Sequence, residues 1–306
     1  TRVSAGLVEQ RAAALVPQLV GGSADLNPST KTYIEGSPAV LRGNFAGRNI
    51  HFGIREHAMG AVVNGLAMTE GFIPFGSTFL VFADYMRPTI RLAALSHLQS
   101  VFVFTHDSVY LGEDGPTHQP VEHLWSHRLI PNTDVVRPAD ARECAAAWTH
   151  ALTRTTGPTV MALTRQNVPV LERAADFDDA VMLRGGYVLV DTKEPRAVLI
   201  ATGAEVSLAV EAAKLLAAQG KPVRVVSMPC LEAFERQDGA YQESVLPAGL
   251  KRVVIELGVT APWHRIAQGG LVIGHDGFGM SAPYQEIAER LGFVPGAIAE
   301  KVAAEI

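Results

Sequence analysis

Two segments of the chain combine residue types in patterns that could support chemistry. In HFGIREHAMGA, Glu56 stands at the start of a predicted apolar helix, where a carboxyl group can act as an acid or base or simply favour the helix dipole. In GSTFLVFADY, Phe79, Phe82 and Tyr85 are spaced three residues apart, which places them near one helical face. Spacing alone indicates core packing for these aromatic residues, and Glu56 is equally compatible with a structural and a chemical role.

A third segment, THDSVYLGEDGPTHQP, gathers titratable side chains on a loop after the apolar run VFVFT. His106, Asp114 and His118 stand there among glycine and proline residues. Loops at the carboxyl ends of parallel strands form the binding crevices of α/β proteins. So many titratable groups seldom collect without a chemical role, so the segment predicts a binding loop.

The elements that must position these segments alternate between helix and strand patterns. Apolar strand runs include VFVFT, TVMAL, AVLIATG, VRVVSMP, RVVIEL and LVI. Apolar periodicity predicts helices over residues 5–16, 57–70, 78–97, 139–154 and 204–219. The helix over 57–70 has an apolar stripe formed by Ala58, Ala61, Val62, Gly65 and Leu66. This alternation predicts an α/β protein of two domains, each with a mainly parallel sheet flanked by helices.

Length and composition agree with two cytosolic domains that act on small molecules. At roughly 150 residues per domain, 306 residues suggest two domains, which we place at 1–168 and 184–306 with a linker at 169–183. The 26 basic and 31 acidic side chains give a net charge of −5 without a basic run, which argues against nucleic acid and anionic membranes as partners. Two cysteines, Cys144 and Cys230, cannot build a disulfide framework, so we expect a cytoplasmic location.

Common cofactor and metal motifs do not match. The pair Gly220-Lys221 is followed by Pro222, which rules out a Walker phosphate loop. His123 and His127 have the i, i+4 spacing of half a zinc site, but no Glu-His or Cys partner stands nearby. We therefore expect no metal site in this chain.

The strings HFGIREHAMGA, GGSADL, THDSVYLGEDGPTHQP, VVRPAD and ALTRQN together closely resemble transketolase over nearly the whole chain. The resemblance implies a thiamine-diphosphate pyrimidine-binding domain at 1–168 and a transketolase C-terminal domain at 184–306. It implies transfer of a two-carbon glycolaldehyde unit from a ketose phosphate to an aldose phosphate, with thiamine diphosphate and a divalent metal.

The resemblance implies that Glu56 and His106 are the catalytic residues. A carboxyl group against N1′ of the aminopyrimidine favours the imino tautomer, whose nitrogen removes the thiazolium C2 proton. Glu56 must then carry a proton part of the time, which an apolar aromatic pocket favours. The implied cofactor-binding residues are Asp25, Ile54, Phe79, Phe82 and Tyr85.

The resemblance also implies a sugar-phosphate site. His106 and Asp114 match residues that hydrogen-bond the sugar. The group that holds the phosphate is matched by Arg2, Ser29, His118 and Arg165. Two guanidinium groups suit a phosphate dianion because they bind its oxygens in pairs. Tyr110 stands where the family usually has a small residue, so we expect the pocket shape to differ there.

The chain lacks the G-D-G motif with which transketolases bind the diphosphate and the metal. We therefore expect it to bind only the pyrimidine end of the cofactor, with Mg or Ca on a partner domain. We expect that partner to be an N-terminal transketolase half, and the assembly to be a homodimer or a heterotetramer. Without the partner we expect this chain to be inactive. The chain is then either a natural split subunit or a fragment of a longer chain.

Two alternatives remain open at this stage. One is a different thiamine diphosphate-dependent transferase, similar to deoxyxylulose-phosphate synthase or dihydroxyacetone synthase. The other is an inactive dimerising module that lacks the diphosphate domain.

Overall fold

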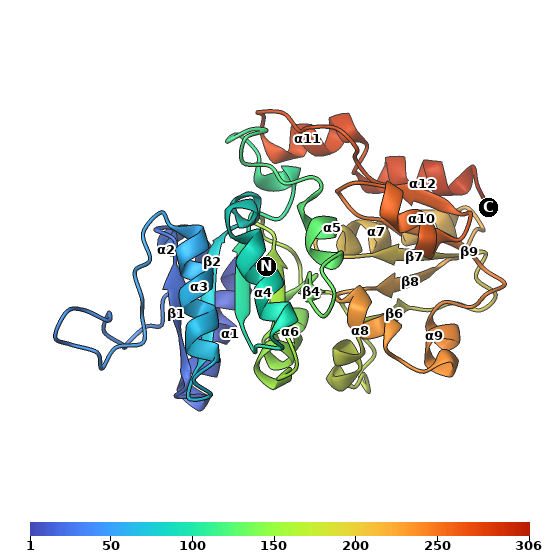
Figure 1. The fold of residues 1–306 in the computed structure, drawn as a ribbon. Helices are drawn as coiled ribbons and strands as arrows, with labels where there is room; N and C mark the ends of the chain where they lie inside the picture. Colours follow the sequence, from blue (N-terminus) through green and yellow to red (C-terminus); the bar gives the residue numbers. More distant parts are fainter.

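The computed structural model describes residues 1–306 and shows two α/β domains side by side (Figure 1). The first domain contains a five-stranded sheet of order β1-β2-β3-β5-β4, in which every neighbouring pair is parallel. Its strands are β1 (Leu19–Ser23), β2 (Ile73–Phe79), β3 (Val101–Thr105), β4 (Asp134–Val136) and β5 (Thr159–Leu163).

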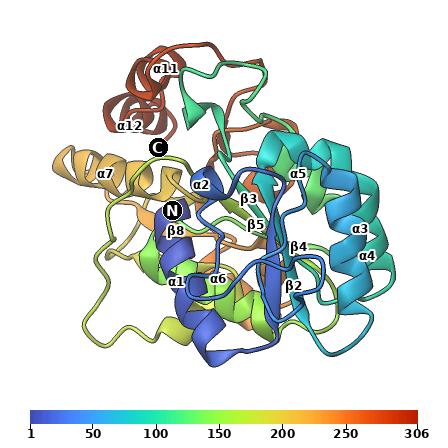
Figure 2. The ribbon, with the colours of Figure 1, turned by 90° about the vertical axis from the view of Figure 1, so that its left-hand side faces the viewer.

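Helices cover both faces of the first sheet (Figure 2). One face packs against α1 (Arg2–Leu15) and α6 (Ala141–Thr153), and the other against α3 (Glu56–Ala67) and α4 (Arg87–Leu95). Shorter elements are α2 (Asn27–Thr30), the 3-10 helices η1 (Leu80–Met86) and η2 (Val109–Leu111), and α5 (His123–Arg128). A parallel sheet covered on both faces explains why its strands read as continuous apolar runs.

The second domain repeats this layered plan with the sheet order β10-β9-β7-β8-β6. Only β6 runs antiparallel to its neighbour β8. The strands are β6 (Tyr187–Val190), β7 (Ala197–Ala201), β8 (Arg224–Ser227), β9 (Lys251–Ile255) and β10 (Leu271–Ile273). The two mainly parallel sheets confirm the predicted fold class.

Helices also cover both faces of the second sheet. One face packs against α7 (Glu205–Ala218) and α12 (Pro295–Ala303), and the other against α8 (Leu231–Glu235), α9 (Gly239–Val245) and α10 (His264–Ala267). The remaining elements are η3 (Asp179–Arg184), η4 (Ala261–Trp263) and α11 (Tyr284–Leu291). None of the helices combines the length and apolar character that crossing a membrane requires.

The prediction of one helix over residues 78–97 was wrong. Residues 73–79 form the buried strand β2, η1 follows, and α4 begins only at Arg87 with Pro88 in its first turn. Proline is favoured at that position because the first turn needs no amide hydrogen bond. The apolar period of 78–97 therefore joined three separate elements into one.

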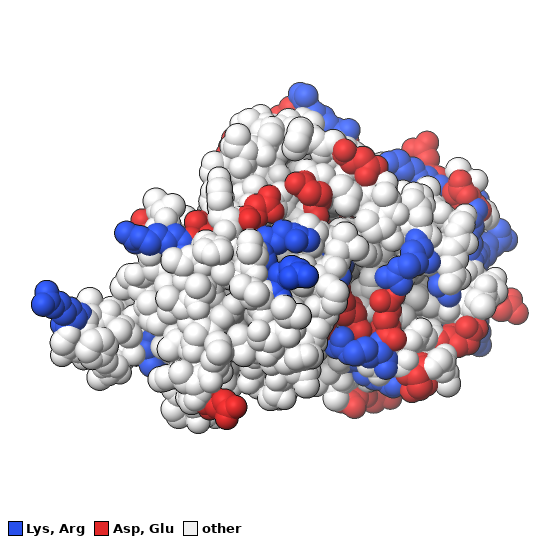
Figure 3. All heavy atoms as spheres, in the orientation of Figure 1, with Lys and Arg blue, Asp and Glu red and all other residues white.

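The apolar stripe predicted for α3 lies on its exposed side. Met59, Gly60 and Val63 are buried against the sheet, whereas Ala61 and Val62 are exposed. Both sides of this helix are apolar, so the pattern alone could not decide which side is buried. The outer face over α3 is uncharged in Figure 3, and it leaves an apolar helix face uncovered in the single chain.

His127 belongs to the core of the first domain. Its side chain is fully buried, stacks on Phe104 at a centroid distance of 5.8 Å, and has no hydrogen-bond partner at either ring nitrogen. Burial, followed by the nearby His123 and Arg87, lowers the pKa of His127 to about 3. The folded protein therefore keeps this ring neutral at mildly acidic pH.

We predict that His127→Leu reduces the loss of stability on acidification. In the unfolded chain His127 has its ordinary pKa near 6.5, so it binds a proton as the pH falls below that value. In the folded chain the ring stays neutral until about pH 3, so the stability of the fold decreases between these two pH values. Between pH 7 and pH 5 this coupling amounts to roughly 2 kcal/mol. Urea unfolding at both pH values measures it, with the exposed His97→Leu as control. An identical pH dependence in His127→Leu and wild type would contradict the prediction.

Candidate active site

The predicted site residues gather at one edge of the first sheet. Ser29 lies on the segment after β1, Phe79 ends β2, His106 follows β3, and Arg165 lies just beyond β5. Because these strands are parallel, their carboxyl ends meet at the same edge, where α/β proteins place their ligands. Arg2 reaches this edge from the first turn of α1.

Four polar residues lie together at this edge. Arg2 Nη1 donates hydrogen bonds to the backbone oxygen of Ser29 at 2.7 Å and to Nε2 of His106 at 3.5 Å. Arg165 donates from Nη1 to the oxygen of Leu111 at 3.1 Å. Burial, and then the positive charge of Arg165, lower the pKa of Arg2. Two partly buried guanidinium groups thus share a region in which an anion would relieve their repulsion.

His106 is a neutral hydrogen-bonding group in this cluster. Since Arg2 donates to Nε2, we assign the ring proton to Nδ1, which lies 2.8 Å from Oγ1 of Thr105. Burial, followed by Arg2, Arg165 and His118, lowers the pKa of His106 to about 3. The backbone of His106 is left-handed, with φ of 60°.

The aromatic residues form a partly open row beside this cluster. Phe79 and Phe82 are stacked at 5.9 Å with 9° between their planes, and Phe82 lies 6.4 Å from Tyr85. The row exists because η1 is a 3-10 helix, in which residues three apart eclipse each other. Phe79 contacts His106 at a centroid distance of 3.7 Å, and Phe82 contacts His118 at 5.5 Å. Phe79 is buried and Tyr85 is 67% exposed, so the row runs from the core to the surface and is only partly the core packing that spacing alone indicated.

Glu56 begins α3, which packs directly against η1. Its side chain is buried, but its carboxyl group makes no hydrogen bond or ion pair within the chain. Ile54, Asp25 and Asp114 are exposed and make no side-chain hydrogen bond to the cluster. The polar cluster and the aromatic row formed by predicted residues are therefore in direct contact. Glu56, Ile54, Asp25 and Asp114 lie outside these contacts.

The ring of Tyr110 packs against the second domain, and its effect on the pocket shape stays a prediction. The ring is buried, its hydroxyl donates to the backbone oxygen of Phe293 at 3.2 Å, and it packs edge-to-face on Tyr284. Both partners belong to the second domain. The large side chain thus anchors the loop between His106 and His118 to the neighbouring domain.

Sequence reasoning missed a buried pair beside His106. Asp107 accepts a hydrogen bond of 2.9 Å from Nε of Arg137, and both side chains are almost completely buried. The available signal was Arg137 in VVRPAD, a charged residue directly after an apolar strand. Such a residue needs a buried partner, which the sequence could not identify.

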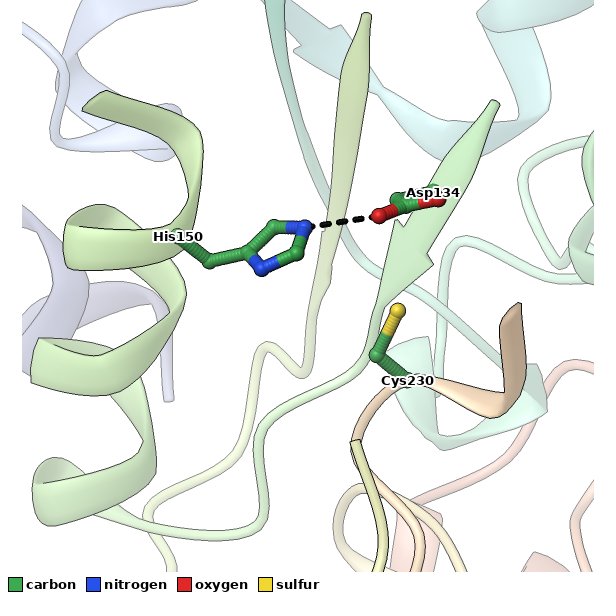
Figure 4. A group of neighbouring side chains, drawn as sticks. All are labelled: Asp134, His150 and Cys230. Atoms are coloured by element: carbon green, nitrogen blue, oxygen red, sulfur yellow. Dashed lines mark hydrogen bonds and ion pairs between the residues drawn. The ribbon is translucent and has the colours of Figure 1, made fainter. Parts of the chain in front are cut away.

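Asp134, His150 and Cys230 lie close enough together to hold a metal ion (Figure 4). However, Asp134 accepts hydrogen bonds from His150 Nε2 at 2.8 Å and from Arg236 Nη1 at 2.8 Å, and it pairs with Arg154 at 2.8 Å. The guanidinium groups of Arg154 and Arg236 oppose a cation, and burial raises the pKa of the Cys230 thiol well above its ordinary value. The cluster is best described as an ion-pair junction between the domains.

The aromatic row and Glu56 fit an aminopyrimidine ring. Stacked aromatic side chains offer a face to an aromatic ring, and an unpaired carboxyl group can hydrogen-bond a ring nitrogen. Tyr85 and Ile54, at 67% and 79% exposed, leave one side of this surface open. These residues therefore form an open surface rather than an enclosed cavity.

Two family models cover most of the chain. Residues 1–170 match the model described as "Transketolase, pyrimidine binding domain", and residues 185–294 match "Transketolase-like TK C-terminal domain". The transketolase of Dictyostelium discoideum is 53% identical over 295 residues, which make up 95% of this chain and 44% of that protein. The transketolase of Aquifex aeolicus is 47% identical over 305 residues, which make up 99% of this chain and 44% of that protein. The chain thus spans less than half the length of these relatives.

Solved structures agree with this relationship. A Pichia stipitis transketolase in complex with sedoheptulose 7-phosphate matches with a TM-score of 0.96 and 40% identity, over 100% of this chain and 45% of that one. A split-gene transketolase, solved as an inactive β4 tetramer, matches with a TM-score of 0.78 and 27% identity, over 99% of this chain and 96% of that one. The sequence motifs, the two sheets and these relatives lead to one conclusion: the chain belongs to the transketolase family.

Proposed function

We propose that this chain supplies the pyrimidine and substrate side of a transketolase active site. The observation that carries the proposal is the cluster of Arg2, Ser29, His106 and Arg165 beside the aromatic row. The assembled enzyme would move a two-carbon unit from a ketose phosphate to an aldose phosphate. In this proposal residues 1–168 carry the site, 169–183 form the linker and 184–306 form the C-terminal domain.

The pyrimidine end of thiamine diphosphate would bind the row of Phe79, Phe82 and Tyr85, with Ile54 and Asp25 at its margin. When bound, thiamine diphosphate supplies the carbon nucleophile that carries the two-carbon unit. Glu56 would hold a proton against the ring nitrogen N1′. Its place at the first residue of α3, beside η1, supports this role. The diphosphate and a Mg or Ca ion would bind to the partner domain.

The sugar phosphate would bind on the other side of the aromatic row. Arg2 and Arg165 provide paired N–H donors for the phosphate, together with Ser29 and His118. His106 would accept a hydrogen bond from a sugar hydroxyl at the neutral Nε2, in place of the long 3.5 Å contact from Arg2, and Asp114 would contact a second hydroxyl. The contact of Phe79 with His106 supports a continuous surface from the cofactor to the substrate.

The missing wall of the pocket would come from another chain. An N-terminal transketolase half would bring the diphosphate site, in a homodimer or heterotetramer. The uncovered apolar face of α3, including Ala61 and Val62, supports a chain-to-chain contact next to Glu56. The similar inactive β4 tetramer supports a second possibility, self-association of this chain without activity until the partner half binds.

We expect Glu56→Ala to abolish most of the transfer activity of the assembled enzyme. The chain is mixed with an N-terminal transketolase half, thiamine diphosphate and magnesium, and transfer from a ketose phosphate to an aldose phosphate is followed. Loss of the acid–base group should lower kcat by roughly 10²–10⁴-fold. Glu70→Ala, which changes an exposed carboxylate just beyond α3, is the matched control. Unchanged turnover in Glu56→Ala would refute the assignment.

Arg165→Ala should raise KM for a phosphorylated ketose far more than it lowers kcat. Removing one charge-assisted contact costs about 1.5–3 kcal/mol, or roughly 10–150-fold in KM. An unphosphorylated ketose should show little change because it lacks the dianion. The exposed Arg11→Ala serves as control. Equal losses for phosphorylated and unphosphorylated ketoses would show that Arg165 does not bind the phosphate.

A further inference from the structure

The second sheet has a crevice at the position where open α/β sheets commonly bind a ligand. From β7 the chain proceeds to β8 on one side and then to β9 on the other, so the topology switches direction between β7 and β9. Open α/β sheets bind ligands at the carboxyl ends of strands at such a point. Here the fully buried side chain of Arg137, from the first domain, fills it.

Arg137 contacts the second domain through its side chain and its backbone. Nη1 donates to Oγ1 of Thr202 at 2.9 Å, and Nη2 donates to Oε1 of Glu205 at 3.2 Å. The backbone oxygen of Arg137 accepts from the amide of Gly203 at 3.1 Å. A Cβ atom on Gly203 would lie 2.8 Å from Nε of Arg137, so glycine is required for this close approach.

Glu256 completes the charged lining of the crevice. It follows β9 and accepts two hydrogen bonds of 2.8 Å from Arg128 and one of 2.6 Å from Thr202. Burial disfavours its charge, but Arg128 and Arg137 hold the pKa of Glu256 at about 2. Glu256 therefore stays ionised in the crevice, which takes a guanidinium group from the first domain.

The Nε edge of the same guanidinium group binds the loop that runs from His106 to His118. Nε of Arg137 donates to Asp107 at 2.9 Å, and Asp107 directly follows His106. His106 has φ of 60°, a left-handed conformation that a side chain other than glycine adopts only when its surroundings enforce it. The bond to Asp107 is such a constraint, next to the residue that needs it.

The second domain also forms hydrogen bonds with Glu113 and Gln119, towards the end of this loop. Gln119 Nε2 donates to the oxygens of Gly112 and Met280, each at 2.9 Å. The hydroxyl of Ser281 donates to the backbone oxygen of Glu113. Together with Tyr110, these contacts tie both ends of the loop to the second domain.

We propose that Arg137 is a positioning residue through which the C-terminal domain sets His106 and the loop up to His118 for the sugar phosphate. The proposal rests on the function proposed above. The C-terminal domain can act without touching the substrate. Thr202 and Glu205 hold the guanidinium group of Arg137, which in turn holds Asp107.

The test compares Arg137→Lys and Thr202→Val with Tyr187→Phe. Lysine keeps the charge but lacks the planar fork with which Arg137 binds Asp107 through Nε and Glu205 through Nη2. Thr202→Val keeps the shape of the side chain and removes the hydroxyl that accepts from Arg137 and donates to Glu256. Tyr187→Phe is the matched control because it removes a different buried hydroxyl of the second domain, which donates to Glu143 at 2.7 Å and accepts from Arg173 at 2.8 Å, and neither partner lies in the loop.

Two readouts use the chain itself and need no activity. Hydrogen exchange of residues 106–118 should accelerate about tenfold in Arg137→Lys and by a smaller factor in Thr202→Val. The ring ¹⁵N signals of His106 should shift in both variants, and Tyr187→Phe should resemble wild type. Wild-type exchange and His106 signals in both variants would overturn the proposal, as would equal loosening of the loop by Tyr187→Phe. If Arg137→Lys does not fold, Thr202→Val decides by the same criteria.

The assembled enzyme gives a third readout. KM for the ketose phosphate should rise about tenfold in Arg137→Lys, whereas Tyr187→Phe should leave it unchanged. A uniform loss of active enzyme, with lower kcat and unchanged KM, would contradict positioning. Absence of activity in the wild-type mixture would refute the proposed function, while the exchange and NMR results would still decide whether Arg137 positions the loop.

Discussion

Buried charges that satisfy one another across the domain boundary constrain this structure most strongly. An ion removed from water costs several kcal/mol unless a well-placed partner compensates it. Arg137 with Glu205 and Arg128 with Glu256 join the two domains, and Arg173 with Asp140 joins the linker to the first domain. A shift of one domain would leave these charges unpaired, so the pairs specify one relative orientation.

The candidate site depends on that orientation. Parallel strands bring Phe79, His106 and Arg165 to one edge, but the loop after β3 is long and contains several polar groups. The bond of Asp107 to Arg137 and the interdomain contacts of Tyr110 and Gln119 fix it there. The C-terminal domain thus has a physical role at the site even though it contributes no residue to the cluster of Arg2, Ser29, His106 and Arg165.

Much of the fold and of the site could be predicted from sequence. Runs such as VFVFT and AVLIATG are unambiguous buried strands, and long strings such as GEDGPTHQP carried the family resemblance that identified His106 and Asp114. The exposed side of α3 could not be predicted, because both of its sides are apolar and only tertiary packing selects one. The strand β2 was hidden for a similar reason, since its end runs directly into η1 without a breaking residue. The partners of Arg137 lie 30 residues away at Asp107 and 68 residues away at Glu205, separations over which a single sequence carries no pairing signal.

The central claim is that this chain holds half of an active site: an aromatic wall, a carboxyl group and a phosphate-binding cluster. The most direct test is calorimetric titration of thiamine diphosphate with magnesium into this chain alone, into an N-terminal transketolase half alone, and into their equimolar mixture. The account predicts saturable binding by the mixture, with one cofactor for each pair of chains, and far weaker binding by this chain alone. Binding by this chain alone as tight as that of the mixture would contradict it.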